Sequence, residues 1–332
     1  MLNIIFKDKQ IMTVREIRKN PFTNEWIIYS ETRQSRPDRE EGFCPLCTGS
    51  EEVPNFNKPL RIPNKFPALS LDEQPKKRRL GEFELMMNGY GKCELIIYTD
   101  VHNAKFVDLN NEEIMGIFEQ WMNATKELSS NEQIQYILPF ENYGPEVGAT
   151  LIHPHGQLYA YPFVPNSISI EMDSIIKYQE ENNSCMVCDY ILSEIQKEKR
   201  IVYQDNDILC LVPYFARYAY DLFIYPKRHV NFLHQCTRTE LNSIITCIRN
   251  SILALNEVFQ KEVSYSLSLH QAPVNVKGTS NYHLYFKVHT PQRNLKSQKL
   301  LGAVETSTMT YINGTLPETA ALNLRKHMES QN

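Results

Sequence analysis

The chain has 332 residues, of which 42% are hydrophobic and 11% aromatic, so it can bury a sizeable core in one large domain or two of ordinary size. A formal net charge of −4 excludes a global basic field that would hold nucleic acid or an anionic membrane, so an anionic ligand must meet local positive charge. The N-terminus has only a short apolar run broken by charge, and a run of about 18 apolar residues occurs nowhere, so we expect a cytoplasmic protein without membrane contact.

Strand-like and helical patterns alternate along the N-terminal half. Four runs rich in β-branched and aromatic residues predict strands, namely EWIIYS, CELIIYT, IQYILPF and GQLYAYPFV. Between them, residues 110–129 place apolar side chains at spacings of three and four, which predicts a helix.

The C-terminal half continues in the same style. Its predicted strands are DILCLVPY, DLFIYP, SYSLSL and HLYFKVH, and residues 237–260 have the apolar spacing of a second long helix. Together the patterns predict an α+β fold in which helices cover antiparallel sheets.

Eight cysteines are present, and four of them form two CxxC pairs in a large chain without a signal peptide, which favours metal over disulfides. Each pair is followed by a strand, a histidine, a helix, a strand and a second histidine. The first set is Cys44, Cys47, His102 and His153, and the second is Cys185, Cys188, His229 and His283. This ordered repeat predicts a duplicated α+β unit, each copy carrying a Cys2His2 zinc site.

We place the two units at residues 1–165 and 166–332, with a connection around 165–184 and a tail formed by the last thirty residues. A single CxxC is more often incidental or redox-active, and it is the repetition that favours Zn2+. The remaining cysteines are interpreted as small buried hydrophobes (Cys93, Cys210, Cys236 and Cys247) and three histidines as ordinary surface or core residues (His234, His289 and His327).

The segment HPHGQ combines three roles. Alternate residues of a strand share a face, so His153, His155 and Gln157 are expected to project together. If His153 is the fourth protein ligand of the first zinc, that zinc has no open position and is structural. His155 is then free to act as a nucleophile, and Gln157 can donate a hydrogen bond to a phosphate oxygen.

Seven ordered segments carry a family resemblance. They are NPFTNEWIIYSETRQSRP, FCPLC, NKFPAL, FENYG, HPHGQ, PYFARYAYDLFIYPKRH and LHQAPVN. The chain, from about residue 15 to 325, resembles the galactose-1-phosphate uridylyltransferase family of the histidine-triad superfamily. The resemblance implies a fold of two fused histidine-triad units, which agrees with the repeat.

The resemblance also implies a two-step transfer. His155 matches the nucleophile that attacks the α-phosphorus of UDP-glucose, releases glucose 1-phosphate and carries the uridylyl group, which galactose 1-phosphate then accepts. The carbonyl of His153 is expected to hold the other ring nitrogen of His155. The family is usually dimeric, so a homodimer whose site borrows residues from a second chain is expected.

Further positions follow from the resemblance one by one. The matched substrate-binding residues are Arg33 and Arg36 for phosphate, Asn64 and Phe66 for uridine, Asn142, Thr150 and Gln157 on the phosphate side, and Lys299 and Glu305 for phosphate and hexose. The segment with Lys299 and Glu305 diverges most from the family.

One departure concerns a second metal. Some members use a glutamate and three histidines, whereas here His270 and His283 are present and Tyr285 fills the third place. The Cys2His2 set of the second half is therefore favoured. In the repeat, Tyr285 stands where His155 stands and Lys287 where Gln157 stands, which predicts one active site for the fused pair.

Two other functions remain open. Plant relatives with the same two CxxC pairs transfer adenylyl from ADP-glucose to phosphate, and both pairs fit either reaction. A zinc-stabilised binding protein without catalysis is a third possibility, against which the intact HPHGQ argues.

Overall fold

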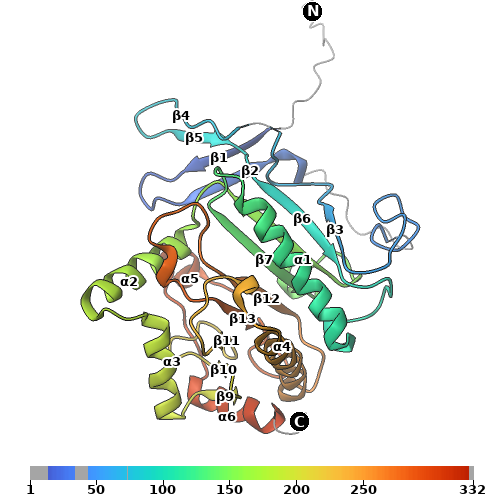
Figure 1. The fold of residues 1–332 in the computed structure, drawn as a ribbon, viewed down its shortest axis with the longest axis vertical. Coiled ribbons are helices and arrows are strands. Elements are labelled where there is room, and N and C mark those ends of the chain that lie inside the picture. Colours follow the sequence, from blue (N-terminus) through green and yellow to red (C-terminus); the bar gives the residue numbers. More distant parts are fainter. Residues whose placement is uncertain (1–13, 34–43, 73, 329–332) are drawn as a thin grey trace, which may run out of the picture.

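A nine-stranded antiparallel sheet forms the centre of the molecule (Figure 1). The computed structural model describes residues 14–33, 44–72 and 74–328. The strand order is β3-β6-β8-β7-β12-β13-β11-β10-β9. Its strands are β3 (Leu60–Pro63), β6 (Lys92–Ile97), β7 (Tyr136–Tyr143), β8 (His155–Tyr161), β9 (Ile201–Gln204), β10 (Ile208–Leu211), β11 (Leu222–Pro226), β12 (Tyr265–His270) and β13 (Tyr285–His289).

The sheet is continuous across the two halves of the chain. The order β6-β8-β7 is mirrored by β11-β13-β12, and β7 pairs with β12 at the junction, where Tyr143 lies opposite Tyr265 and Phe140 opposite Ser268. The expected α+β class is therefore confirmed. Because the two halves share one sheet, the second half begins at β12, which is separated from the strand that carries His155 only by β7.

Helices cover both faces of this sheet (Figure 1). The helices are α1 (Asn111–Ser129), α2 (Asn166–Asn182), α3 (Met186–Lys197), α4 (Arg238–Phe259), α5 (Ala303–Thr308) and α6 (Pro317–Met328), and short 3-10 turns are η1 (Glu31–Arg33), η2 (Phe106–Asp108), η3 (Pro145–Val147), η4 (Leu233–Gln235) and η5 (Thr279–Asn281). The two predicted long helices are confirmed as α1 and α4. Asn110 and Thr237 cap them, because their side chains accept N–H groups of the first turn.

The main hydrophobic core lies between the sheet and the pair α1 and α4. Phe118 stacks on Trp121 and on Phe286, with ring centroids 5.3 and 5.4 Å apart, so a residue of β13 packs directly under α1. A second core lies on the opposite face in the C-terminal half, under α2 and α3. In the N-terminal half, the same face of the sheet carries His155. In the C-terminal half, the second core covers this face.

A smaller antiparallel sheet belongs to the N-terminal half. Its order is β2-β1-β5-β4, with β1 (Arg15–Lys19), β2 (Trp26–Ser30), β4 (Arg78–Arg79) and β5 (Leu85–Asn88). Ile17 and Met87 pack with Phe163, which follows β8, so this sheet lies near the end of β8. Of its strands, the sequence patterns predict only the segment around β2.

The expected link and the expected tail both contain helices that pack on the rest of the molecule. The expected link at 165–184 is largely helix α2, because Ile168, Met172 and Ile175 are buried on its inner side. The expected tail includes α6, whose Ala320 and Leu324 are fully buried in the main core. Of the four cysteines expected in the core, Cys236 is only half-buried.

A buried ion-pair network anchors α6. Arg200, only 6% exposed, donates two hydrogen bonds to the carboxylate of Glu194 in α3, at 2.6 and 3.1 Å, and one to Glu318 in α6, at 2.5 Å. Since Glu194 is 1% exposed, its charge depends on Arg200 for compensation.

Replacing Arg200 with alanine should therefore destabilise the protein by about 3–5 kcal/mol, because it leaves a buried carboxylate unpaired. Urea unfolding followed by circular dichroism measures this change. Arg238→Ala is the matched control, since it removes an ion pair to Glu112 whose side chains are 61% and 78% exposed, and it should cost less than about 1 kcal/mol. Equal effects of the two substitutions would show that the network does not anchor α6.

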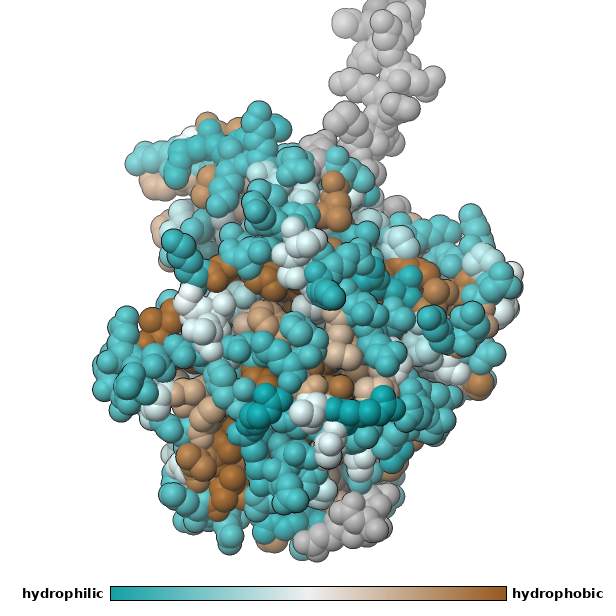
Figure 2. Space-filling view, viewed as in Figure 1, coloured by the Kyte–Doolittle hydropathy of each residue, from teal (hydrophilic) through white to brown (hydrophobic). Residues whose placement is uncertain are grey.

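Among the described residues, no helix is long and apolar enough to cross a membrane. On the face in Figure 2, hydrophilic side chains predominate and separate the apolar patches from one another. The large aliphatic side chains are concentrated in the cores instead.

Candidate functional site

His155 opens β8, and its ring lies on the face of the sheet opposite α1. In the antiparallel pairing with β6, His155 lies opposite Ile97 and Gln157 opposite Leu95, so both catalytic candidates share one face with Tyr159. The intervening Gly156 and Leu158 face the main core. The expected common projection of His155 and Gln157 is confirmed, whereas His153 lies in the loop before the strand.

A hydrogen bond sets the tautomer of His155. Its Nδ1 lies 2.8 Å from the carbonyl oxygen of His153, as the family resemblance implies. Because a carbonyl only accepts, Nδ1 carries the proton and donates it, and Nε2 keeps its lone pair. His155 is 8% exposed, so its imidazole is largely buried.

The first predicted metal set is brought together. The ligand atoms of Cys44, Cys47, His102 and His153 all lie within 4.8 Å of one another. Cys47 Sγ lies 3.3 Å from Nδ1 of His102 and 3.6 Å from Nδ1 of His153. Tetrahedral zinc, with bonds of about 2.3 Å to sulfur and 2.0 Å to nitrogen, would place these atoms about 3.5 Å apart. The donor set and its spacing fit zinc.

A second shell supports this fit. Nε2 of His153 lies 2.8 Å from the carbonyl oxygen of Thr99, so it carries the proton and Nδ1 is free to bind a metal. Burial lowers the pKa of His153, which favours the neutral ring that a metal requires. His153 thus has two roles. Its ring belongs to the metal set, and its carbonyl group accepts the hydrogen bond from the ring of His155.

The second predicted metal set repeats this geometry. The ligand atoms of Cys185, Cys188, His229 and His283 also lie within 4.8 Å of one another. Cys188 Sγ lies 3.6 Å from Nδ1 of His229 and 3.5 Å from Nδ1 of His283. The Nε2 atoms face carbonyl oxygens of Ser280 and Pro226, at 3.0 and 2.9 Å. This set fits zinc by the same criteria.

The place equivalent to His155 in the second half is filled with packed rings. Tyr285, the first residue of β13, stacks on His270 with centroids 4.5 Å apart and planes 3° apart, and its hydroxyl donates to Glu171. Burial lowers the pKa of His270 to about 3. Lys287 pairs with the buried Asp221 at 3.7 Å. His270 therefore packs against Tyr285, apart from the metal set that contains His283.

Several residues matched to substrate binding lie around β8. The side chain of Arg33 donates to the hydroxyl of Tyr159 at 3.3 Å, which brings a cation to the edge of the His155 face. The loop after β3 lies beside this edge, since the N–H of Asn64 donates to the carbonyl of Cys93, which is opposite Tyr159. Asn64 Oδ1 in turn accepts the N–H of Phe66.

Asn142 is oriented from the second half. Its Oδ1 accepts a hydrogen bond from Ser266 Oγ at 2.9 Å, across the pairing of β7 with β12. The amide nitrogen of Asn142 is then directed away from Ser266 and is available as a donor. Thr150 lies exposed in the loop between η3 and His153, and Arg36 lies outside the described residues.

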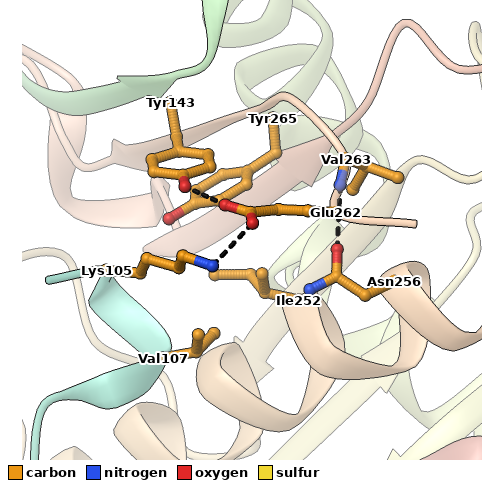
Figure 3. A pocket seen from close by; sticks show the side chains of 8 residues that line it. All are labelled: Lys105, Val107, Tyr143, Ile252, Asn256, Glu262, Val263 and Tyr265. Carbon is orange, nitrogen blue, oxygen red and sulfur yellow. Dashed lines mark hydrogen bonds and ion pairs between the residues drawn. The ribbon is translucent and has the colours of Figure 1, made fainter. Parts of the chain in front are cut away.

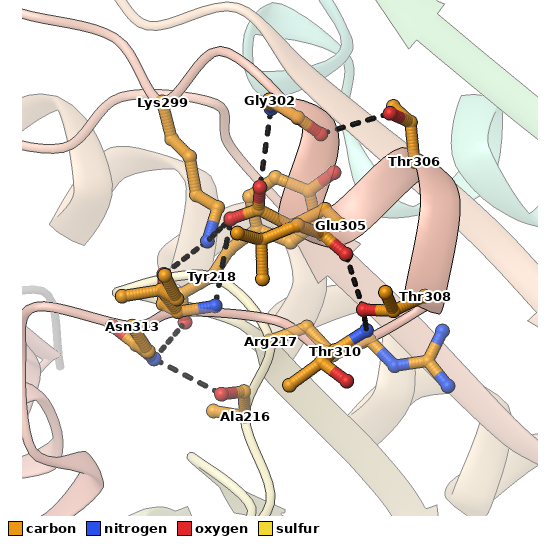
Figure 4. Close-up of polar contacts among 12 residues, drawn as sticks. Ala216, Arg217, Tyr218, Lys299, Gly302, Glu305, Thr306, Thr308, Thr310 and Asn313 are labelled. Atoms are coloured by element: carbon orange, nitrogen blue, oxygen red, sulfur yellow. Dashed lines mark hydrogen bonds and ion pairs between the residues drawn. The ribbon is translucent and has the colours of Figure 1, made fainter.

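Lys299 and Glu305 lie together in the second half (Figure 4). Lys299 Nζ is 3.2 Å from the carboxylate of Glu305, and it lies over the rings of Tyr218 and Tyr311. Tyr218 stacks on His289, whose strand position is opposite Ser266. The two predicted residues are thus joined to each other, and a series of contacts through Tyr218, His289 and Ser266 leads from them to Asn142.

The sequence patterns missed Tyr159, Ser266 and Glu141. Tyr159 could have been found, because it follows Gln157 at the spacing of two that defines a strand face. Ser266 and Glu141 gave no local signal, since their partners are distant in sequence.

Comparisons with known proteins agree along nearly the whole chain. The family model for the N-terminal domain of galactose-1-phosphate uridyl transferase matches residues 5–165, and the model for its C-terminal domain matches residues 171–325. A galactose-1-phosphate uridylyltransferase of Thermotoga maritima is 35% identical over 94% of this chain and 98% of its own length. An ADP-glucose phosphorylase of Arabidopsis thaliana is 27% identical over 94% of this chain and 92% of its own.

A solved structure described as a uridylyltransferase superposes with a TM-score of 0.86 at 28% identity, covering 95% of this chain and 99% of its own. The crystal structure of the Arabidopsis thaliana ADP-glucose phosphorylase has a TM-score of 0.72 at 24% identity, which shows a common fold.

Proposed function

The chain belongs to the galactose-1-phosphate uridylyltransferase family, and from this premise we propose that it transfers a uridylyl group from UDP-glucose to galactose 1-phosphate through a covalent intermediate on His155. The observation that carries the proposal is the hydrogen bond from Nδ1 of His155 to the carbonyl of His153. In the neutral ring this bond places the lone pair on Nε2, and the ring shares its face of the sheet with Gln157 and Asn142.

The first step forms a P–N bond and breaks a P–O bond. Nε2 of His155 attacks the α-phosphorus of UDP-glucose, glucose 1-phosphate leaves, and the uridylyl group stays on the ring. The ring gains positive charge as the bond forms, and the carbonyl of His153 stabilises that charge through the proton on Nδ1.

The second step reverses the first with a different acceptor. A phosphate oxygen of galactose 1-phosphate attacks the same phosphorus, the P–N bond breaks, and UDP-galactose leaves with Nε2 restored. In both steps the amides of Gln157 and Asn142 donate to the phosphoryl oxygens, and Arg33 supplies positive charge near the phosphates. On the uridine side, Asn64 and Phe66 hold the base, with Arg36 and Thr150 as further phosphate contacts.

Zinc in both Cys2His2 sets is part of the proposal. Each set has four protein ligands, so a bound zinc would act as a structural cross-link without an open position for substrate. The first set includes His153, whose carbonyl holds His155. The ion would therefore keep this loop in the position that the nucleophile requires.

We also propose a cytoplasmic homodimer built from units 1–165 and 166–332. The segment around Lys299 and Glu305 supports the dimer, because Leu300 is 84% and Ile312 is 62% exposed beside these two polar residues. A second copy could cover these side chains and receive Lys299 and Glu305 at its own site. The molar mass in solution tests this assembly.

A second candidate is the ADP-glucose phosphorylase reaction, in which phosphate accepts an adenylyl group. The likeness to the Arabidopsis thaliana protein extends over 94% of this chain, and both CxxC pairs fit either reaction. The lower identity of 27%, against 35% for the Thermotoga maritima protein, favours the uridylyl reaction. The third possibility, a zinc protein without catalysis, does not explain why a hydrogen bond orients the ring of His155.

The intermediate gives a direct test. UDP-glucose labelled at the α-phosphorus, mixed with the enzyme in the absence of acceptor, should leave acid-labile and base-stable label on the protein and release about one glucose 1-phosphate per active site. The same half-reaction is run in parallel with ADP-glucose. The nucleotide sugar from which glucose 1-phosphate is released identifies the nucleotide that the enzyme uses. Steady-state lines at several acceptor concentrations should be parallel. Intersecting lines with no labelled protein would contradict the covalent mechanism.

A further inference from the structure

Glu141 is a buried carboxyl group that the proposed reaction does not use. We propose that Glu141, together with Tyr98 and Tyr265, is a positioning group that supports Gly156 from the core side and so holds His155 and Gln157 in their reactive geometry. This inference rests on the proposed function of His155 and Gln157. It adds a support on the opposite face of the sheet.

The register places Glu141 under the catalytic strand. Phe140 of β7 lies opposite Gln157 of β8, so in the antiparallel ladder Glu141 is the residue next to Gly156. Side chains alternate along a strand, and Glu141 therefore faces the main core while Asn142 faces the substrate side. Glu141 is 2% exposed.

Tyr98 touches the catalytic strand on both sides of His155. Its N–H donates to the carbonyl of Pro154 at 3.2 Å. Its hydroxyl occupies the space beside Gly156, because a Cβ on Gly156 would lie only 2.4 Å from that oxygen. Tyr98 is 1% exposed, so movement of its ring would be transmitted to the peptide that joins His155 to Gln157.

Tyr265 holds Glu141 from the second half of the chain. Its hydroxyl donates to Oε1 of Glu141 at 2.9 Å. The ring stacks on Tyr143 with centroids 5.2 Å apart, and Tyr143 in turn donates to Glu262, which pairs with Lys105 (Figure 3). The support under β8 is therefore tied to a polar group at the edge of the core.

The carboxyl group is suited to this place only in its neutral form. Burial raises the pKa of Glu141 to about 7, although its interactions with the hydroxyl groups of Tyr265 and Tyr98 oppose the rise. The titratable groups that face it are Tyr98 at the end of β6 and Tyr265 on β12, and Lys105 is already paired with Glu262. Oε2 of Glu141 and the Tyr98 hydroxyl are both buried without a hydrogen-bond partner at bonding distance among the described residues, and the two groups interact. We infer that neutral Glu141 carries its O–H on Oε2 and directs it towards the Tyr98 oxygen.

The test compares variants that keep or remove this support. Glu141→Gln retains an acceptor for Tyr265 and a donor for Tyr98 without the ability to ionise. Glu141→Leu removes both, and Tyr98→Phe removes the hydroxyl alone. Labelled UDP-glucose release, kcat, KM, zinc content and the thermal melting midpoint are measured for each, from pH 5.5 to 8.5.

We expect Glu141→Leu and Tyr98→Phe to lower kcat about 10-fold or more with KM changed less than about 3-fold, because displacement of the nucleophile costs rate more than binding. Glu141→Gln should stay within about 3-fold of the wild type. The wild type should lose kcat as pH rises through about 7, where Glu141 ionises, and Glu141→Gln should not lose it there.

The stability of the folded wild type should also fall as the pH rises and Glu141 ionises. The carboxyl is protonated in the folded protein up to about pH 7 and in the unfolded chain only up to about its ordinary value of 4.5. Its contribution to folding is thus complete at low pH and declines between these two values. The melting midpoint of Glu141→Gln relative to the wild type should therefore rise from pH 5.5 to pH 8.

A double substitution tests the contact with Gly156. Gly156→Ala should be strongly impaired, since its Cβ meets the Tyr98 hydroxyl. Adding Tyr98→Phe removes that oxygen and should recover part of the lost rate, a non-additive result that independent effects cannot produce.

Some outcomes would overturn the inference. They are wild-type kcat in both Glu141→Leu and Tyr98→Phe, loss of kcat in Glu141→Gln equal to that in Glu141→Leu, or additive effects of Gly156→Ala and Tyr98→Phe. If Glu141→Leu does not fold, Tyr98→Phe and the pH profile of Glu141→Gln decide.

A wild type inactive with every nucleotide sugar would contradict the proposed function instead. The inference is then decided by the rate at which diethyl pyrocarbonate modifies His155. That rate should differ from the wild type in Tyr98→Phe and match it in Glu141→Gln.

Discussion

Replacing His155 with glycine should lower kcat on the order of 10⁴-fold or more, because it removes the atom that forms the covalent bond to phosphorus. The fold and the zinc content should not change, since the ring of His155 is not among the four ligand side chains of the first metal set. Labelled UDP-glucose should leave no label on the variant protein. Free imidazole should partly restore the release of glucose 1-phosphate, because the deleted ring leaves space beside Gln157.

The matched control lies at the equivalent place of the second half. Tyr285→Phe removes a hydroxyl that donates to Glu171 and should leave kcat within about 3-fold, because this position carries no chemistry. Normal turnover of His155→Gly would refute the assignment of the nucleophile. Loss of zinc from that variant would mean that the defect is structural.

Zinc content should approach two ions per chain, and the two sites should be lost separately. Cys44→Ser should lose one ion and Cys185→Ser the other, because a tetrahedral Cys2His2 site rarely survives the loss of a thiolate. Elemental analysis of the purified proteins measures this. Cys236→Ser is the control, since Cys236 is half-buried and belongs to neither set.

The two losses should differ in their effect on activity. Cys44→Ser frees His153 from the metal set, so the carbonyl that holds His155 moves and kcat should fall about 100-fold, in the range seen for supporting residues of active sites. Cys185→Ser should mainly lower the melting temperature, because its site lies beside the ring-filled position of Tyr285. If Cys185→Ser did not change the zinc content, the second Cys2His2 set would not bind zinc.

The ligand chemistry and the main elements could be predicted because they depend on local signals. Two thiols separated by two residues and a histidine before a strand are visible in the sequence, and the apolar spacing of α1 and α4 reflects the period of a helix. The strand face shared by His155 and Gln157 follows from alternation alone.

The remaining elements could not be predicted, since packing rather than pattern determines them. Helix α2 was expected to be a connection, and its apolar side is recognised only through the core that it covers. Helix α6 was expected to be part of a tail, and it is held by Arg200, which immediately precedes β9 and lies 118 residues away from Glu318. Short exposed strands such as β4 carry no periodic signal at all.

The sequence by itself determined which residues are proposed to carry the chemistry: His155 as nucleophile, the two Cys2His2 sets as zinc ligands, and Tyr285 in the place of a second nucleophile. These follow from residue type and spacing, which survive any arrangement of the chain. Only the tertiary structure decided that both halves share one sheet through β7 and β12. That junction brings Ser266 to Asn142 and Tyr265 to Glu141, across 124 residues in each case. The physical reason is that burial, and with it the neutral state of Glu141, depends on which strands pair, and strand pairing between distant segments leaves no mark on either segment alone.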